Sequence, residues 1–96
     1  MTGAARTSAG LDERRRRLLY RAWHRGTREM DLIMGRFADA TIGDLTDAEL
    51  GELEQLADVP DPVLYGWLTG SRPVPDSHDL TVFRRLRDFH ALRHAK

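Results

Sequence analysis

Cysteine is absent from this chain of 96 residues, which excludes a disulfide framework and any metal site or nucleophile built on a thiolate. No apolar run approaches the roughly 20 residues that a membrane-spanning helix requires. The formal net charge is zero, with 15 basic and 15 acidic side chains. This balance argues against a general nucleic-acid-binding protein, which carries excess positive charge. The length fits one small domain with a single core.

The first ten residues, MTGAARTSAG, lack the apolar centre of a secretory signal and are short for an organellar transit peptide. We therefore expect residues 1–10 to form a disordered tail and residues 11–96 to form a single helical domain. The expected location is the cytoplasm of a bacterium, without insertion into a membrane.

Although the charges balance, they are segregated along the chain. Arginines crowd the first third, and no Lys or Arg occurs from Phe37 to Ser71, where acidic residues accumulate. The last segment is basic again, with Arg84, Arg85, Arg87, Arg93 and Lys96. Two interpretations are open: helices of opposite charge complement one another within the fold, or a basic face is offered to a partner. Composition alone favours the first.

Hydrophobic periodicity predicts helices and no strand. The first helix is expected from about Leu11 to Arg25. The second repeats apolar residues at i, i+3, i+4, i+7 and i+8, namely Met30, Ile33, Met34, Phe37 and Ala38. A third helix is expected to begin at a capping box, in which the Thr46 hydroxyl and the Glu49 carboxylate each accept a free backbone N–H.

Two further helices complete the predicted fold. The fourth is expected to have Asp61 as its N-cap, Pro62 at its first helical position and Gly70 as its left-handed end. The fifth runs from Ser77 or His78 to His94. The sequence thus predicts an all-α fold, a small compact bundle of about five short helices. Its core should contain Phe37, Leu53, Trp67, Leu68 and Phe83.

Residues for catalysis are sparse. His90 and His94 have the i, i+4 spacing of two zinc ligands, but Arg87 and Arg93 beside them oppose a dication. The chain has no glycine loop of the phosphate-binding kind and no nucleophile elbow. We therefore expect no metal site, no catalytic residues and a protein that is not an enzyme.

The stretch HRGTREMD joins the first two predicted helices. Gly26 falls where the first helix should end, and Thr27 suits the N-cap of the second. Arg25 and Glu29 would complement the helix dipoles on an exposed turn, each contributing about 0.3–1 kcal/mol. The stretch could therefore be only a turn.

A second interpretation is a surface for recognition. Trp23, His24 and Arg28 crowd the same corner of the chain. Trp and Arg on a short turn have the composition of an interface hot spot.

The segment RRRLLYRAWHRGTREMDLIMGRFAD resembles the start of the FAD assembly factors, the succinate dehydrogenase assembly factor 2 family, called SdhE in bacteria. The signature of that family, Arg-Gly-x-x-Glu, is matched by Arg25, Gly26 and Glu29, and its common continuation by Met30-Asp31. Further along, LTDAELGELEQL and DVPDPVLYGWLTG resemble the acidic third helix and the Asp-Pro-x-Leu-x-x-Trp-Leu segment of the family. The resemblance covers about residues 11–70.

This resemblance implies an assembly factor that binds the flavoprotein subunit of succinate dehydrogenase, and in bacteria that of fumarate reductase. The factor promotes covalent attachment of FAD to a histidine of this client. No FAD is expected to bind tightly to the chain itself, which should be a monomer without a nucleic-acid partner. The residues implied in client binding are Arg25, Gly26 and Glu29, with Trp23, His24, Arg28 and Asp31 around them.

Within this hypothesis, Arg25 and Glu29 would offer opposite charges to the client, and Gly26 would allow close approach of the backbone. Two alternatives stay open. One is a generic helical adaptor for other proteins. The other is a small DNA-binding module whose arginine-rich first helix contacts phosphates.

Overall fold

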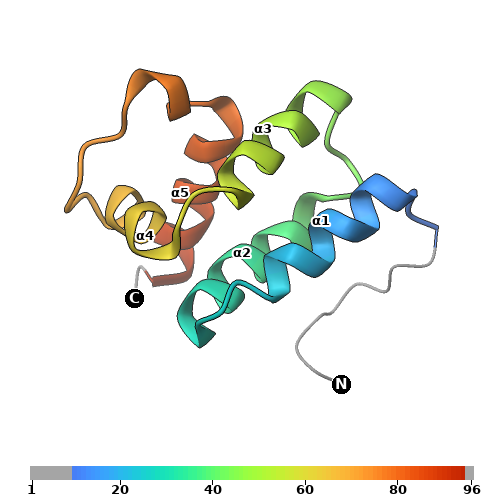
Figure 1. Cartoon of the computed structure of the whole chain (residues 1–96), viewed down its shortest axis with the longest axis horizontal. Coiled ribbons are helices and arrows are strands. Elements are labelled where there is room, and N and C mark those ends of the chain that lie inside the picture. Colours follow the sequence, from blue (N-terminus) through green and yellow to red (C-terminus); the bar gives the residue numbers. More distant parts are fainter. Residues whose placement is uncertain (1–9, 95–96) are drawn as a thin grey trace.

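The computed structural model describes residues 10–94. Within them the chain forms five α-helices, one short 3-10 helix and no strand (Figure 1). The elements are α1 (Glu13–Trp23), α2 (Arg28–Thr41), α3 (Asp47–Ala57), α4 (Asp61–Thr69), η1 (Asp76–His78) and α5 (Thr81–His94). The predicted all-α bundle is confirmed. The predicted tail lies outside the described residues, apart from Gly10.

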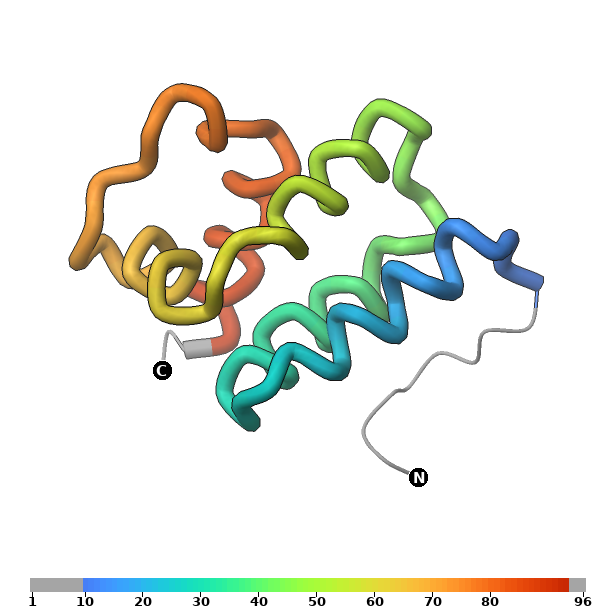
Figure 2. The backbone as a smooth tube through the Cα atoms, in the orientation of Figure 1, coloured from blue at the N-terminus to red at the C-terminus, as the bar shows by residue number. Residues whose placement is uncertain are grey.

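The helices α1 and α2 lie alongside each other and form one side of the molecule (Figure 1). Helix α3 packs on α1 and on α5, and α5 also packs on α2. Figure 2 shows how the chain leaves α4 in a wide loop before it returns as α5. The turn between α1 and α2 comes close to the connection between α3 and α4, where Arg25 hydrogen-bonds to residues of that connection.

The local signals that begin and end helices act as predicted in three places. The Thr27 hydroxyl accepts the Met30 N–H at 3.2 Å and caps α2. Thr46 and Glu49 form the complete capping box of α3. Gly70 ends α4 with a left-handed φ of 85°. These contacts are local in sequence, so the residue pattern is sufficient to specify them.

The predicted cap of α4 is wrong. Pro60 is the N-cap, Asp61 is the first helical residue, and no side chain caps this helix. The Asp61 carboxylate instead accepts a hydrogen bond from the Arg25 Nε at 2.8 Å. A cationic partner from another part of the chain has taken the place of the local backbone partner, and the same guanidinium also donates to the carbonyl oxygens of Ala57 and Val59.

The ends of two other helices also differ from prediction. Helix α1 ends at Trp23 rather than Arg25. Helix α5 begins at Thr81 rather than near Ser77, because residues Asp76–His78 form the separate 3-10 turn. At the start of α5 the Val82 N–H is accepted by Glu52 Oε1 of α3 at 2.8 Å. A carboxylate from a distant helix therefore caps α5.

One continuous apolar core holds the helices together. The five predicted core residues, Phe37, Leu53, Trp67, Leu68 and Phe83, all lie in it. Trp23 packs against its edge, where its indole lies directly over Gly35 of α2. A Cβ atom at Gly35 would come within 2.2 Å of Trp23 Cδ2. The absence of a side chain at this position therefore lets α1 and α2 approach closely.

Candidate partner-binding site

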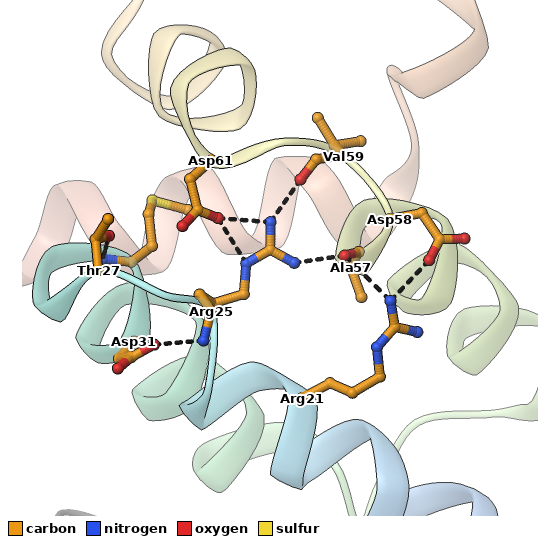
Figure 3. Close-up of polar contacts among 9 residues, drawn as sticks. Arg21, Arg25, Thr27, Asp31, Ala57, Asp58, Val59 and Asp61 are labelled. Atoms are coloured by element: carbon orange, nitrogen blue, oxygen red, sulfur yellow. Dashed lines mark hydrogen bonds and ion pairs between the residues drawn. The ribbon is translucent and has the colours of Figure 1, made fainter.

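The turn between α1 and α2 has a defined conformation that its own residues hold in place. Gly26 has a φ of 118°, which L side chains rarely adopt. The Arg25 N–H donates to the Asp31 carboxylate, which lies in the first turns of α2 (Figure 3). Together with the Thr27 cap, these contacts hold residues 24–31 in one backbone path.

The Arg25 side chain points inward from this turn, toward the connection between α3 and α4 (Figure 3). Its guanidinium pairs with Asp61 at 2.8 Å and donates to the carbonyl oxygens of Ala57 and Val59. Only 7% of the Arg25 side chain and 15% of the Asp61 side chain are exposed. The predicted position of Arg25 as a residue of an exposed turn is therefore wrong.

The surroundings of Arg25 explain this burial. The carbonyl groups at a helix C-terminus lack partners within the helix, and Ala57 is the last residue of α3. A guanidinium offers five donors in a fixed plane, so it satisfies the carbonyls and the carboxylate at once. Arg25 thus satisfies the polar groups of the connection between α3 and α4 and links this connection to the turn.

Two arginines of α1 also bind acidic residues of the same chain. Arg21 pairs with Asp58 at 2.7 Å (Figure 3). Arg14 pairs with Glu54 at 2.8 Å, and its hydrogen bond lowers the pKa of Glu54 below the ordinary value. The interpretation in which helices of opposite charge complement one another is confirmed for α1 and α3.

The outer side of the turn carries residues of a different kind. Gly26, Arg28 and Glu29 are all exposed. Apart from Gly26 itself and its two chain neighbours, no heavy atom of the described residues lies within 4 Å of the position that a Cβ of Gly26 would occupy, so the space beside it is open. Within the described residues, the side chains of Arg28 and Glu29 form no hydrogen bond or ion pair. One positive and one negative charge therefore remain available to a partner.

His24 and Trp23 complete this corner. The His24 ring stacks on Tyr20 with centroids 3.9 Å apart, and its Nδ1 lies 2.7 Å from the Tyr20 carbonyl oxygen. Tyr20 is 65% exposed, so the stacked pair presents an aromatic face beside the turn. Trp23 is half-buried instead.

The structure therefore brings the seven predicted site residues to one end of the α1–α2 pair. Some of them are partly buried, and the others are exposed. Arg25, Asp31 and Trp23 support the turn from within, whereas the outer residues are His24, Gly26, Arg28 and Glu29. Sequence reasoning missed Tyr20 as a neighbour and Asp61 as the partner of Arg25. The i, i+4 spacing of Tyr20 and His24 was an available signal for the first, and nothing local indicated the second.

Two kinds of feature are not found in the part of the chain that the structure describes. No three His, Asp or Glu side chains come together there as metal ligands. None of the helices among residues 10–94 has the length and apolar character needed to cross a bilayer.

The sequence of this chain is similar to a protein-family model and to several known proteins. The family model described as "Flavinator of succinate dehydrogenase" matches residues 16–90. The FAD assembly factor SdhE of Acetobacter pasteurianus is 42% identical over 76 residues, which cover 79% of this chain and 70% of that protein.

Mitochondrial proteins are also similar. The succinate dehydrogenase assembly factor 2 of Mycosarcoma maydis is 39% identical over 70 residues, covering 73% of this chain and 29% of that protein. The protein of the same name from Scheffersomyces stipitis is 35% identical over 82 residues, covering 81% of this chain and 55% of its own length. The chain thus spans only part of these mitochondrial relatives.

Proposed function

Because this chain belongs to the family of flavinators of succinate dehydrogenase, we propose that it is the assembly factor for covalent flavin in that enzyme. It binds the flavoprotein subunit and promotes attachment of FAD to a histidine of this client. The match over residues 16–90 carries the proposal, since it includes both the turn at Arg25 to Glu29 and the helices that support it. The flavoprotein of fumarate reductase is proposed as a second client.

The proposed docking surface is the outer side of the turn. Gly26, Arg28 and Glu29 are exposed there, and the two charged side chains have no internal partner among the described residues. Opposite charges on one short segment favour a single orientation of a complementary partner. The missing side chain at Gly26 leaves room for the client backbone to approach. His24 extends this surface along α1.

Arg25 has a different part in this proposal. Its buried contacts with Asp61 and the α3–α4 connection hold the turn in position. A preformed surface loses less conformational freedom on binding than a flexible one. Arg25 is therefore a positioning residue, and the contacts with the client come from its neighbours in the turn.

The factor acts on the client without a catalytic residue of its own. FAD, carried by the client, would supply the electrophilic 8α-methyl carbon to which the client histidine becomes joined. By binding one conformation of the client preferentially, the factor raises the population in which that histidine is aligned for reaction. In this proposal the factor acts as a monomer and holds no FAD tightly.

The DNA-binding alternative is less well supported by the geometry. It requires the arginines of α1 to reach phosphates, but Arg14 and Arg21 of this helix, and Arg25 of the turn that follows, are engaged with carboxylates of the same chain. Their positive charge is neutralised locally, which removes much of the electrostatic attraction that nucleic-acid binding requires.

The proposal is tested in a strain of the native host from which this gene has been deleted. Covalent flavin on the denatured succinate dehydrogenase flavoprotein is measured by its fluorescence in a gel. We expect the signal to fall in the deletion strain and to return when the full chain is supplied from a plasmid. Unchanged covalent flavin in the deletion strain would contradict the proposal.

A further inference from the structure

A pocket of about 200 Å³ opens between α2 and α5, next to the turn described above. Its apolar lining comes from Leu32, Ile33 and Phe89. Its charged lining comes from Glu29, Arg36 and Arg93, and His90 completes the wall. Glu29 belongs to both the turn and the pocket, so the two form one continuous surface.

The arginines of this pocket differ from those of α1. Arg36 is exposed, and its side chain forms no hydrogen bond or ion pair within residues 10–94. The Arg93 guanidinium lies over the Phe89 ring, 5.6 Å from its centroid, rather than against a carboxylate. Glu29 is the single acidic residue of the lining. The two arginines of the lining outnumber its one carboxylate, and neither Arg36 nor Arg93 forms an ion pair within the described part of the chain.

The size of the pocket limits what it can hold. Sites for small molecules and cofactors are typically about 300–1,000 Å³, so a volume of about 200 Å³ is too small for a dinucleotide. It suits one or two amino-acid side chains. An apolar wall beside two guanidinium groups matches a carboxylate side chain with an apolar neighbour.

We propose that this pocket receives an Asp or Glu side chain of the flavoprotein client and forms a second contact beside the turn. This inference rests on the proposed function, because it takes the flavoprotein as the partner. Arg36 is the principal determinant, since it alone of the two arginines has no ring or carboxylate contact. Leu32 and Phe89 contact the apolar neighbour of the acidic residue.

The test compares Arg36→Glu with Arg72→Glu by calorimetric titration against the FAD-loaded flavoprotein. Arg72 is exposed in the loop after α4 and has no carboxylate partner among the described residues, so both variants change the net charge equally. We expect Arg36→Glu to weaken binding at least tenfold and Arg72→Glu to change it less than twofold, with matching melting temperatures. Equal affinities of the two variants would overturn the pocket assignment.

A second measurement identifies the occupant directly. A diazirine analogue of leucine at position 32 keeps the size of Leu32, and illumination of the complex joins it to the nearest client residue. Mass spectrometry should place the adduct within two positions of an Asp or Glu of the client. An adduct far from any acidic residue overturns the proposal.

The outcomes separate the pocket from the proposed function. If wild-type protein fails to bind the flavoprotein, both proposals fall together. If wild type binds and Glu29→Ala weakens binding while Arg36→Glu does not, the pocket assignment alone is wrong.

Discussion

The Arg25 guanidinium lies 2.8 Å from the Asp61 carboxylate, and this pair joins the turn between α1 and α2 to the first residue of α4. The two residues are 36 positions apart in the chain. The carbonyl oxygens of Ala57 and Val59 accept further hydrogen bonds from the same guanidinium. One side chain of the signature motif thus belongs to the interior of the fold, whereas its neighbours face outward.

Arg25→Ala should destabilise the protein by about 3–5 kcal/mol, because it leaves a largely buried carboxylate without its cation. Arg14→Ala is the matched control, since it removes a pair between α1 and α3 whose side chains are 38% and 37% exposed. Exposed pairs contribute little, so its effect should be much smaller. Chemical denaturation of both variants measures the difference, and equal losses would refute the structural role of Arg25.

Glu29→Ala should separate client binding from folding. Glu29 is exposed in the first turn of α2, so its loss should cost folding about 1 kcal/mol or less. Loss of one partner from a desolvated charge pair with the client costs about 2–5 kcal/mol, which weakens affinity by more than tenfold. Thermal unfolding and titration against the FAD-loaded flavoprotein measure the two effects. Affinity equal to wild type would remove Glu29 from the docking surface.

Gly26→Ala and Gly26→Arg form a matched pair of variants. Both carry the backbone strain of a φ near 118°, and a Cβ at this position meets no heavy atom of the described residues within 4 Å beyond its chain neighbours. Each should therefore lose about 1–3 kcal/mol of folding stability. We expect only Gly26→Arg to abolish covalent flavin on the client, because its bulk occupies the space that the client backbone enters. A folded Gly26→Arg variant with full activity would show that no close approach occurs here.

Gly35→Ala should destabilise the contact between α1 and α2. The added methyl group would lie 2.2 Å from Trp23 Cδ2, so the indole must move. Such overpacking typically costs about 1–3 kcal/mol. In a Trp67→Phe background, the fluorescence of Trp23 should report the displacement together with the lower melting temperature. The double variant Trp23→Leu and Gly35→Ala should lose less than the sum of the single changes, and strict additivity would argue against this contact.

Stability should fall in acid partly through Glu54. The hydrogen bond from Arg14 lowers the pKa of Glu54 in the folded protein below its ordinary value of 4.5. The unfolded state therefore binds the proton more readily than the folded state. The stability that the ionised Glu54 carboxylate contributes is present above pH 4.5 and is lost as the pH falls through the pKa of Glu54 in the folded protein. Glu54→Gln should flatten the pH dependence of the melting temperature below this value. If the melting temperature of Glu54→Gln falls with pH as steeply as that of the wild type, other carboxylates cause the acid sensitivity.

The existence of the five helices could be predicted from the sequence, because most of the signals that specify them lie within a few residues of one another. The apolar repeat of α2, the Thr46–Glu49 capping box and the left-handed Gly70 each depend on contacts no more than one helical turn away. The core could be predicted for the same reason, because apolar residues at helical spacing lie on one face of a helix and are buried together.

Which charged residues of the turn are buried and which are exposed depends on the packing of the helices and could not be predicted from the sequence. From the sequence, Arg25 and Glu29 looked equivalent, as two dipole-stabilising residues on one exposed turn. The packing of α1 against α3 brings two carbonyl groups and Asp61 to Arg25, whereas no such partners reach Glu29 among the described residues. Partners more than 30 positions away leave no periodic or local signal, because their meeting depends on how whole helices pack.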